Sequence, residues 1–460
     1  MIFSSNVFLF AYLPIVLALY YIFPRKLRNP VLLITSLIFY GWGEPIYLFL
    51  MIATIALDYF CGLLIARYWE MPKAKKAVLI IGVVLNLASL GFFKYAGFFA
   101  QQFNAISFLP DISVPDISLP IGISFYVFQS MSYIIDVYRQ DAPVQKDPMT
   151  FGTYVTLFPQ LIAGPIVRYA DVAEQLDHRE ENVPDFASGV LLFMAGLGKK
   201  MLLANPMANL CQQIIGQSGT AAAWAGIAAY TLQIYFDFSG YSDMARGLGR
   251  MLGFEFLPNF HYPYISRSVT EFWRRWHISL STWFKEYVYI PLGGNRKGLA
   301  RQMLNIAIVW ALTGFWHGAS WNFLLWGIYY AILLILEKSF LLKLLHKLPK
   351  FVGHIYTIFV FMMGWALFYF TDLSKLGGFF RNLFTLSPTS TENLHFIAAF
   401  LPLMAAAVFV STPVGHRFWE THKEKAAIRW GCIAVAALGM MLCVAALASQ
   451  SYNPFIYFRF

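Results

Sequence analysis

The sequence predicts an all-α polytopic membrane protein. Of its 460 residues, 58% are hydrophobic and only 13% are charged, and the mean hydropathy is +0.58. Soluble domains carry about 25% charged residues, so this chain has too little charge to cover a surface that faces water. These values exclude a soluble enzyme, a disordered chain and a disulfide-bonded secreted module. At roughly 20 apolar residues per span, the chain has room for about 11–12 transmembrane helices.

The charges between the apolar stretches predict the topology. Basic loops at 24–29 and 67–77 alternate with loops at 42–45 and 99–118 that lack Lys and Arg. Cytoplasmic loops carry the excess of Lys and Arg, so we expect the N-terminus outside and the basic loops in the cytoplasm. The net charge of +10 then mainly reflects topology, and nucleic-acid binding is not expected. The expected spans are 6–23, 30–41, 46–66, 78–98, 119–138, 186–216, 221–240, 303–317, 319–336, 352–371, 393–411 and 430–449.

A broken apolar segment follows the fifth expected span. Residues 151–168 are apolar but contain Pro159, Gly164 and Pro165. Proline in a helix interior removes a hydrogen bond and clashes with the preceding turn. Irregular backbone at membrane depth persists only where protein or a water-filled cavity shelters it. The segment is therefore either a re-entrant hairpin or a loop at the membrane surface, and the motif alone does not decide between them.

A basic, tryptophan-rich segment covers residues 261–301. Seven Lys and Arg side chains lie in it, and apolar residues such as Phe272, Trp276 and Trp283 recur at steps of three, four and seven positions. This pattern predicts a basic amphipathic helix at the membrane interface. Such a helix can also dock against the core of its own protein.

Two histidines are the strongest candidates for chemistry. His317 lies in NIAIVWALTGFWHGASWNFLLW, with a glycine on either side. We expect the aromatic neighbours to keep its imidazole desolvated and neutral, as a general base requires. The alternative is a hydrogen-bonded core histidine. His277 follows Arg274 and Arg275, a pair that suits recognition of phosphate or, alternatively, of lipid headgroups at the interface.

Two carboxylates lie at the end of an apolar span. The stretch YFDFSGYSDMARGLG (235–249) contains Asp237 and Asp243. They could bind a cation, orient a histidine or pair with Arg246, and the alternative is a pair of helix-end charges at the interface. The four cysteines have no CxxC spacing, and the chain has no HExxH motif. We therefore expect no bound metal.

Five blocks of sequence, in this order, resemble the membrane-bound O-acyltransferase superfamily and within it the alginate O-acetyltransferase type. They are LPIGISFYVFQSMSYIIDVYR (119–139), LFPQLIAGPIVRY (157–169), YFDFSGYSDMARGLG (235–249), PYISRSVTEFWRRWHISLSTWFKEYVYIPLGGNR (263–296) and TGFWHGASWNFLLWG (313–327). The resemblance implies one membrane domain over 1–460, in which tilted, re-entrant and interfacial amphipathic helices surround a central funnel. Its parts would be N-terminal spans (1–150), a possible re-entrant hairpin (151–168), a catalytic core segment (235–327) and C-terminal spans (352–460).

The same resemblance implies transfer of an acetyl group across the cytoplasmic (inner) membrane. The donor would be a cytoplasmic thioester, acetyl-CoA, with no bound cofactor. An extracytoplasmic acetyltransferase partner protein would pass the group to a polysaccharide such as alginate or another exopolysaccharide. His317 would correspond to the essential histidine of the family, and His277 to its upstream partner. Candidates for substrate binding or positioning are Arg274, Arg275, Trp316, Asp237, Asp243 and Asn322.

Three other functions stay open on the sequence. The same chemistry could act on peptidoglycan or cellulose. A polysaccharide transporter or flippase would also have many spans in membrane lipid and a broken hairpin, although we find no internal repeat. A scaffold that only anchors a secreted partner is the third.

Overall fold

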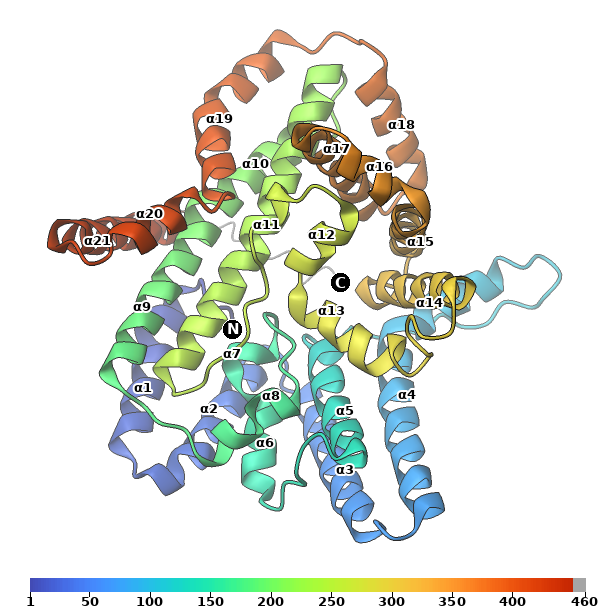
Figure 1. Cartoon of the computed structure of the whole chain (residues 1–460), viewed down its shortest axis with the longest axis vertical. Coiled ribbons are helices and arrows are strands. Elements are labelled where there is room, and N and C mark those ends of the chain that lie inside the picture. Colours follow the sequence, from blue (N-terminus) through green and yellow to red (C-terminus); the bar gives the residue numbers. More distant parts are fainter. Residues whose placement is uncertain (450–460) are drawn as a thin grey trace. The chain divides into compact units, whose positions relative to one another are not determined.

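The computed structural model describes residues 1–449, and every regular element in this range is a helix (Figure 1). The expected all-α fold class is confirmed. The helices form two compact units. Unit 1 comprises residues 1–193 and 244–257, and unit 2 comprises residues 194–243 and the chain from 258 onward.

Unit 1 contains the first part of the chain, and its helices pack as neighbours in sequence. Its elements are η1 (Phe8–Tyr12), α1 (Leu13–Ile22), η2 (Arg25–Leu27), α2 (Arg28–Gly41), α3 (Tyr47–Arg67), α4 (Pro72–Asn104), α5 (Ile123–Arg139), α6 (Pro148–Thr156), α7 (Phe158–Leu161) and α8 (Tyr169–Asp177).

Two long helices pass from one unit into the other, and unit 2 holds the rest. The shared helices are α9 (Val183–Gly198) and α11 (Thr220–Met251). The elements of unit 2 are η3 (Lys199–Ala204), α10 (Asn205–Ile214), η4 (Pro263–Ile265), α12 (Val269–Arg275), α13 (Ile278–Phe284), η5 (Lys285–Tyr289), α14 (Leu299–His317), α15 (Trp321–Leu336), η6 (Glu337–Leu341), α16 (Leu342–Lys347), α17 (Lys350–Tyr369), α18 (Leu373–Phe384), α19 (Thr391–Val410), α20 (Val414–His422) and α21 (Ala426–Ser449).

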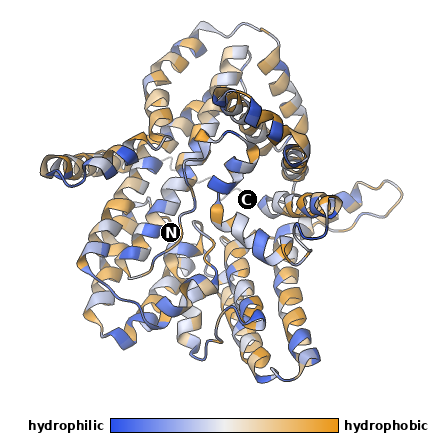
Figure 2. Ribbon diagram, in the orientation of Figure 1, coloured by the Kyte–Doolittle hydropathy of each residue, from blue (hydrophilic) through white to orange (hydrophobic). Residues whose placement is uncertain are grey.

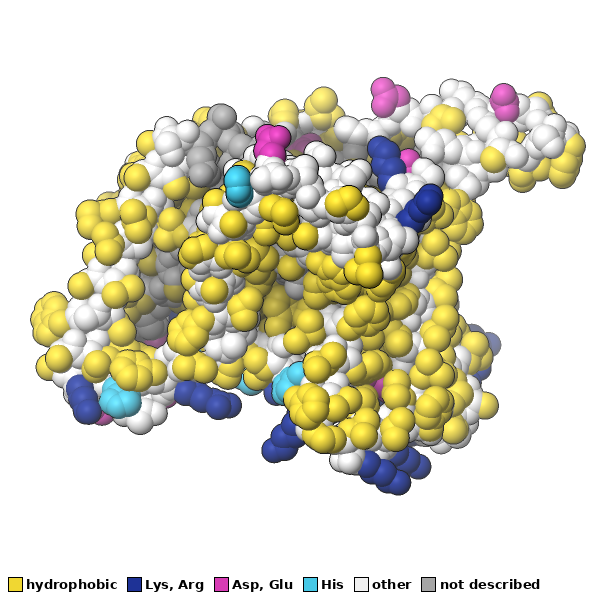
Figure 3. All heavy atoms as spheres, turned by 90° about the horizontal axis from the view of Figure 1, so that it is seen from above, with side chains coloured by type: hydrophobic (Ala, Val, Ile, Leu, Met, Phe, Trp, Pro, Cys, Tyr) yellow, Lys and Arg dark blue, Asp and Glu magenta, His cyan; other side chains and the backbone are white. Residues whose placement is uncertain are grey.

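Within residues 1–449, six helices are long and apolar enough to cross a membrane: α3, α4, the continuous run Val183–Ile214, α17, α19 and α21. Many of their apolar side chains face outward, including Phe49 at 74% exposure and Val435 at 71%. Figure 2 shows the hydrophobic residues along α3 and α4, and Figure 3 shows apolar side chains over most of the visible face. Such a surface is stable in lipid rather than in water. The chain is a multi-pass membrane protein. The other expected spans also lie in helices, which are shorter or more polar.

The segment 151–168 is broken as its prolines predict, and it is buried inside unit 1. Helix α6 ends where Leu157 leaves the helical conformation, and the short α7 follows. Side chains satisfy the freed backbone groups. The Phe158 N–H donates to Ser36 Oγ at 3.1 Å, and Gln160 Nε2 donates to the Tyr154 carbonyl at 2.7 Å. This shelter is what irregular backbone at membrane depth requires, and re-entry into the membrane stays a prediction.

The segment 261–301 differs from the continuous amphipathic helix that its spacing predicts. Helix α12 ends at Arg275, Trp276 is extended, and His277 adopts a left-handed conformation with φ of 45° before α13 begins. The chain therefore changes direction at residues 276–277. Trp276 and Trp283 are buried, at 4% and 3% exposure, so they pack inside the protein instead of facing lipid. The spacing of the apolar residues is consistent with this burial, but it does not predict the break between α12 and α13.

Helices α14 and α15 approach closely because glycines face each other across the contact. A Cβ atom added to Gly314 would lie 2.3 Å from the Phe323 carbonyl oxygen, and one added to Gly327 would lie 2.3 Å from that of Trp310. Small residues allow this kind of approach between membrane helices. The contact fixes the end of α14, where His317 is the last residue.

Candidate active site

His317 lies in an aromatic cage in unit 2. Its side chain is buried, and its ring meets those of Trp316, Trp326 and Phe368 edge-on, with centroids 5.0, 5.1 and 5.2 Å away. The three rings come from α14, α15 and α17. The cage removes the imidazole from bulk water and limits how it can rotate.

His277 is buried at the break between α12 and α13. Its left-handed φ of 45° is unusual for a residue with a side chain. Residues held in such conformations concentrate at functional sites. Burial lowers the pKa of His277 to about 3, so its imidazole is neutral at physiological pH. Asn259 holds the break: its backbone carbonyl accepts the Ile278 N–H at 3.0 Å, and its Oδ1 lies 3.2 Å from His277 Nδ1.

The two histidines line one cavity of about 400 Å³. The Trp316 ring links them, with its centroid 6.2 Å from that of His277 and 5.0 Å from that of His317. Most of the wall is apolar. The remaining lining residues are Thr270, Trp273, Arg274, Trp276, Leu280, Ser281, Phe284, Lys285, Tyr289, Ile306, Val309, Trp310, Thr313, Leu334 and Lys338.

Three exposed cations, Arg274, Lys285 and Lys338, line the cavity from α12, η5 and η6. We call them the cationic rim. Lys285 forms an exposed ion pair with Glu286 at 2.9 Å. Within the described part of the chain, no acidic group pairs with Arg274 or Lys338, so the rim keeps net positive charge. An apolar cavity with a cationic rim suits a ligand with an apolar arm and an anionic head.

The other predicted site residues do not line the cavity. Arg275 is held by Glu271, with Nη2 2.9 Å from its Oε1, and Nη1 donates to the His261 carbonyl at 3.1 Å. Trp316 contacts both histidine rings without lining the cavity. Asn322 is buried and donates from Nδ2 to the Leu367 and Phe368 carbonyls at 3.2 and 3.3 Å. These contacts make Asn322 an anchor between α15 and α17.

The carboxylates on α11 form ion pairs away from the cavity. Asp237 pairs with Lys200 and Asp243 with Lys199, each with a nitrogen–oxygen distance of 2.6 Å. The two lysines are the first residues of η3, a π-helical turn, and both side chains reach α11. The partners are lysines of η3, whereas the sequence had suggested Arg246 as the ion-pair partner.

Two residues that the sequence reasoning missed hold the α12–α13 hairpin. One is Asn259. The other is Glu337, whose carboxylate accepts the N–H groups of Val269 and Thr270 at 2.7 and 2.8 Å and so caps α12 from η6. Glu337 could have been identified from the sequence, because an acidic residue at the end of an apolar span is costly and therefore a candidate for a specific role. Asn259 lies in an ordinary loop sequence beside Pro258, and no local pattern distinguishes it.

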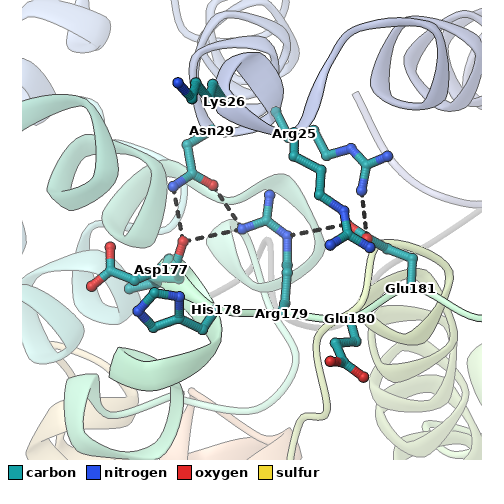
Figure 4. Close-up of a pocket in the computed structure, with 10 residues that line it drawn as sticks. Arg25, Lys26, Asn29, Asp177, His178, Arg179, Glu180 and Glu181 are labelled. Atoms are coloured by element: carbon teal, nitrogen blue, oxygen red, sulfur yellow. Dashed lines mark hydrogen bonds and ion pairs between the residues drawn. The ribbon is translucent and has the colours of Figure 1, made fainter.

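Unit 1 has a second hollow, of about 420 Å³, which we call the polar pocket (Figure 4). Glu181 is its centre: Arg28 lies 2.5 Å from it, and the Tyr20 hydroxyl donates to it at 2.6 Å. Burial would raise the pKa of Glu181, but the hydrogen bonds from Tyr20 and Arg28 outweigh it and lower the pKa. Arg179 donates to Asn29 Oδ1 at 2.8 Å. These mutually neutralising groups form a polar anchor, without the aromatic walls of the histidine cavity.

Residues 1–449 form a helical, multi-pass membrane protein in which two buried histidines line one cavity, an arrangement that suits a membrane enzyme. Residues 137–376, which include both histidines, match the family model for MBOAT, the membrane-bound O-acyltransferase family. The chain belongs to this family and is an O-acyltransferase.

Several curated proteins are similar to the chain. "Probable alginate O-acetylase AlgI" of Azotobacter vinelandii is 39% identical, and the alignment covers all of both chains. The protein of the same name in Pseudomonas aeruginosa is 42% identical over 86% of this chain and 77% of its own. "Peptidoglycan O-acetyltransferase" of Helicobacter pylori is 34% identical over 80% of this chain and 77% of its own. The resemblance seen in the sequence blocks is confirmed.

Proposed function

We propose that the chain transfers an acetyl group from cytoplasmic acetyl-CoA, through the inner membrane, for O-acetylation of an extracytoplasmic polysaccharide. The supporting observation is that His317 and His277 line one apolar cavity with a cationic rim. Neither the donor nor the route follows from the family alone. They rest on the chemistry of the cavity and on the basic loops expected in the cytoplasm.

The apolar wall and the rim suit the two ends of acetyl-CoA. The acetylated pantetheine arm would lie in the cavity, whose volume of about 400 Å³ is too small for the whole donor. The phosphates would remain at Arg274, Lys285 and Lys338, because phosphate forms strong charge-assisted hydrogen bonds with Arg and Lys. The thioester would then lie among the aromatic side chains near the histidines.

The reaction needs a base at the thioester. His317 would take the proton of the incoming hydroxyl as its oxygen attacks the thioester carbonyl carbon. The new C–O bond forms, the C–S bond breaks, and the proton passes to the departing thiolate. Alternatively, His317 itself would attack, carry the acetyl group and release it to the hydroxyl. Both routes need a neutral imidazole, and both give one ester and one free thiol per thioester.

The acceptor is proposed from the relatives. A relative named for alginate aligns over the whole chain at 39% identity, whereas the relative named for peptidoglycan aligns over 80% of it at 34% identity. We therefore favour alginate or a similar exopolysaccharide, with peptidoglycan as the second candidate. An extracytoplasmic partner protein would receive the acetyl group and complete the transfer to the glycan.

The direct test uses purified protein in proteoliposomes with acetyl-labelled CoA. Alginate oligosaccharides or peptidoglycan glycan strands are supplied with a secreted acetyltransferase partner from the same cell envelope. We expect the thioester to be cleaved and the label to appear as an ester on one glycan. A transporter or a scaffold would leave the thioester intact, and that result would overturn the proposal.

The cationic rim should control donor affinity. In the double variant Arg274→Ala/Lys338→Ala, we expect KM for acetyl-CoA to rise by about 10-fold, as the loss of two exposed phosphate contacts predicts. The value of kcat should change little, and added salt should reduce the difference between the two proteins. Lys343→Ala/Lys347→Ala, on the exposed α16, is the matched control. Equal KM values for the two double variants would argue against phosphate binding at the rim.

A further inference from the structure

The contacts around Asn259 determine which ring nitrogen of His277 carries a proton. Asn259 is buried at 1% exposure, and its Oδ1 lies 3.2 Å from the Ser279 backbone nitrogen and 2.9 Å from Ser279 Oγ. A backbone N–H can only donate, so the amide atom facing it must be the oxygen. This fixes the orientation of the Asn259 amide group.

An amide oxygen can only accept, so the partner atom in His277 must donate. Nδ1 of His277 lies 3.2 Å from the same Oδ1 and 3.4 Å from Ser279 Oγ. The Ser279 hydroxyl donates its proton to Asn259 Oδ1, so towards Nδ1 it too can only accept. In a neutral imidazole one nitrogen donates and the other accepts. The proton is therefore on Nδ1, and Nε2 is the nitrogen with the lone pair.

Asn259 is itself anchored from both sides. Its Nδ2 donates to Ser242 Oγ on α11 at 3.2 Å, and its backbone carbonyl accepts the Ile278 N–H at 3.0 Å. On α11, Phe238 packs edge-on against the His277 ring with a centroid distance of 4.6 Å. The ring is thus held in position as well as in one tautomer, and His277 lines the cavity whereas Asn259 does not.

We infer that Asn259 is a positioning residue that holds His277 as the Nδ1–H tautomer, so that Nε2 serves as an acceptor for the substrate hydroxyl. This inference rests on the proposed function. It excludes one role for neutral His277, because a lone pair cannot stabilise the developing oxyanion. His277 instead orients the hydroxyl, so that its oxygen is in position to attack the thioester.

The surrounding charges bear on the pH dependence of this tautomer. Asp237 and Asp243 on α11 form ion pairs with Lys200 and Lys199. Arg275 on α12 forms an ion pair with Glu271. His261 lies in the same loop as Asn259. The remaining groups are His317 and the three cations of the rim. Burial is the cause that lowers the pKa of His277 and so opposes its protonation.

The test compares kcat and KM for acetyl-CoA in Asn259→Ala and Asn259→Asp between pH 5.5 and 8.5. For Asn259→Ala we expect kcat to fall by about 10- to 100-fold, a substantial part of what a general base contributes, with KM unchanged. Asn259→Asp keeps an acceptor and should retain most of the activity at pH 8.5. Its carboxylate raises the pKa of His277, so its activity should fall as the pH falls.

Asn305→Ala is the matched control, because Asn305 is also fully buried, donates to the Gly294 carbonyl at 2.9 Å and does not line the cavity. It should keep nearly the wild-type kcat. Asn259→Ala with kcat near wild type, or Asn259→Asp with the wild-type pH profile, would overturn the inference. If Asn259→Ala fails to fold, the pH profile of Asn259→Asp decides. No thioester cleavage by the wild type would instead refute the proposed function.

Discussion

Replacing His317 by alanine should abolish most acetyl transfer while the protein folds and inserts normally. We expect kcat to fall by about 10²–10⁴-fold, the range that a positioned base contributes. The change removes an imidazole whose ring contacts Trp316, Trp326 and Phe368 and which lines the cavity together with His277. The measurement is release of free thiol from acetyl-CoA by purified protein, together with acetyl ester content of the cell's glycan.

The matched control for His317 is His346→Ala, at an exposed position on α16. It should retain full activity at equal expression. Acetylation that is unchanged in His317→Ala would refute the assignment of His317. A labelled acetyl group that is captured by rapid quenching on wild-type protein but not on His317→Ala, and that hydroxylamine removes, would favour the route in which the histidine carries the acetyl group.

The largest effect on stability is expected at Lys200. It is paired with Asp237 at 2.6 Å, and both side chains are only 2–3% exposed. Lys200→Met removes the ammonium group from a buried carboxylate, which costs about 3–5 kcal/mol of stability. We expect a clearly lower melting temperature for the detergent-solubilised protein. Lys200→Met/Asp237→Leu should recover most of the loss, because it removes both charges together.

Lys423→Met provides the comparison for this buried pair. Lys423 pairs with Glu420 at the same 2.6 Å, but both side chains are about half exposed, at 45% and 47%. Exposed pairs contribute little because water and salt screen them. Its melting temperature should match that of the wild type. An equal loss in Lys200→Met and Lys423→Met, or no recovery in the double variant, would contradict the role given to burial.

Local sequence predicted the helices well because the signals for them are local. The expected spans all lie in helices, and the breaks at Pro159 and Pro165 lie in a broken, buried segment, as the restrictions on proline require. The prediction of one continuous helix over residues 261–301 was wrong. Its break at His277 depends on hydrogen bonds to Asn259, and nothing in the spacing of its apolar residues records them.

The candidate site was predictable in part for the same reason. His317, His277 and Arg274 could be selected because ionisable groups beside aromatic residues are costly in a membrane and are kept for a purpose. The structure places all three on one cavity. Lys285 and Lys338 could not be assigned to it, because their place in the rim depends on how η5 and η6 pack against α12 and α14.

The amino-acid sequence is enough to predict a helical membrane protein of the O-acyltransferase family with His317 and His277 as its candidate catalytic residues. Composition and local motifs suffice for that, because the cost of exposing apolar groups to water depends on residue type alone. Three features appear only in the folded chain: Asn259 contacts His277, Lys200 pairs with Asp237, and Arg274 lines the cavity while Arg275 does not. Hydrogen bonds and ion pairs depend on distance and direction between groups far apart in the chain, and folding alone brings those groups together.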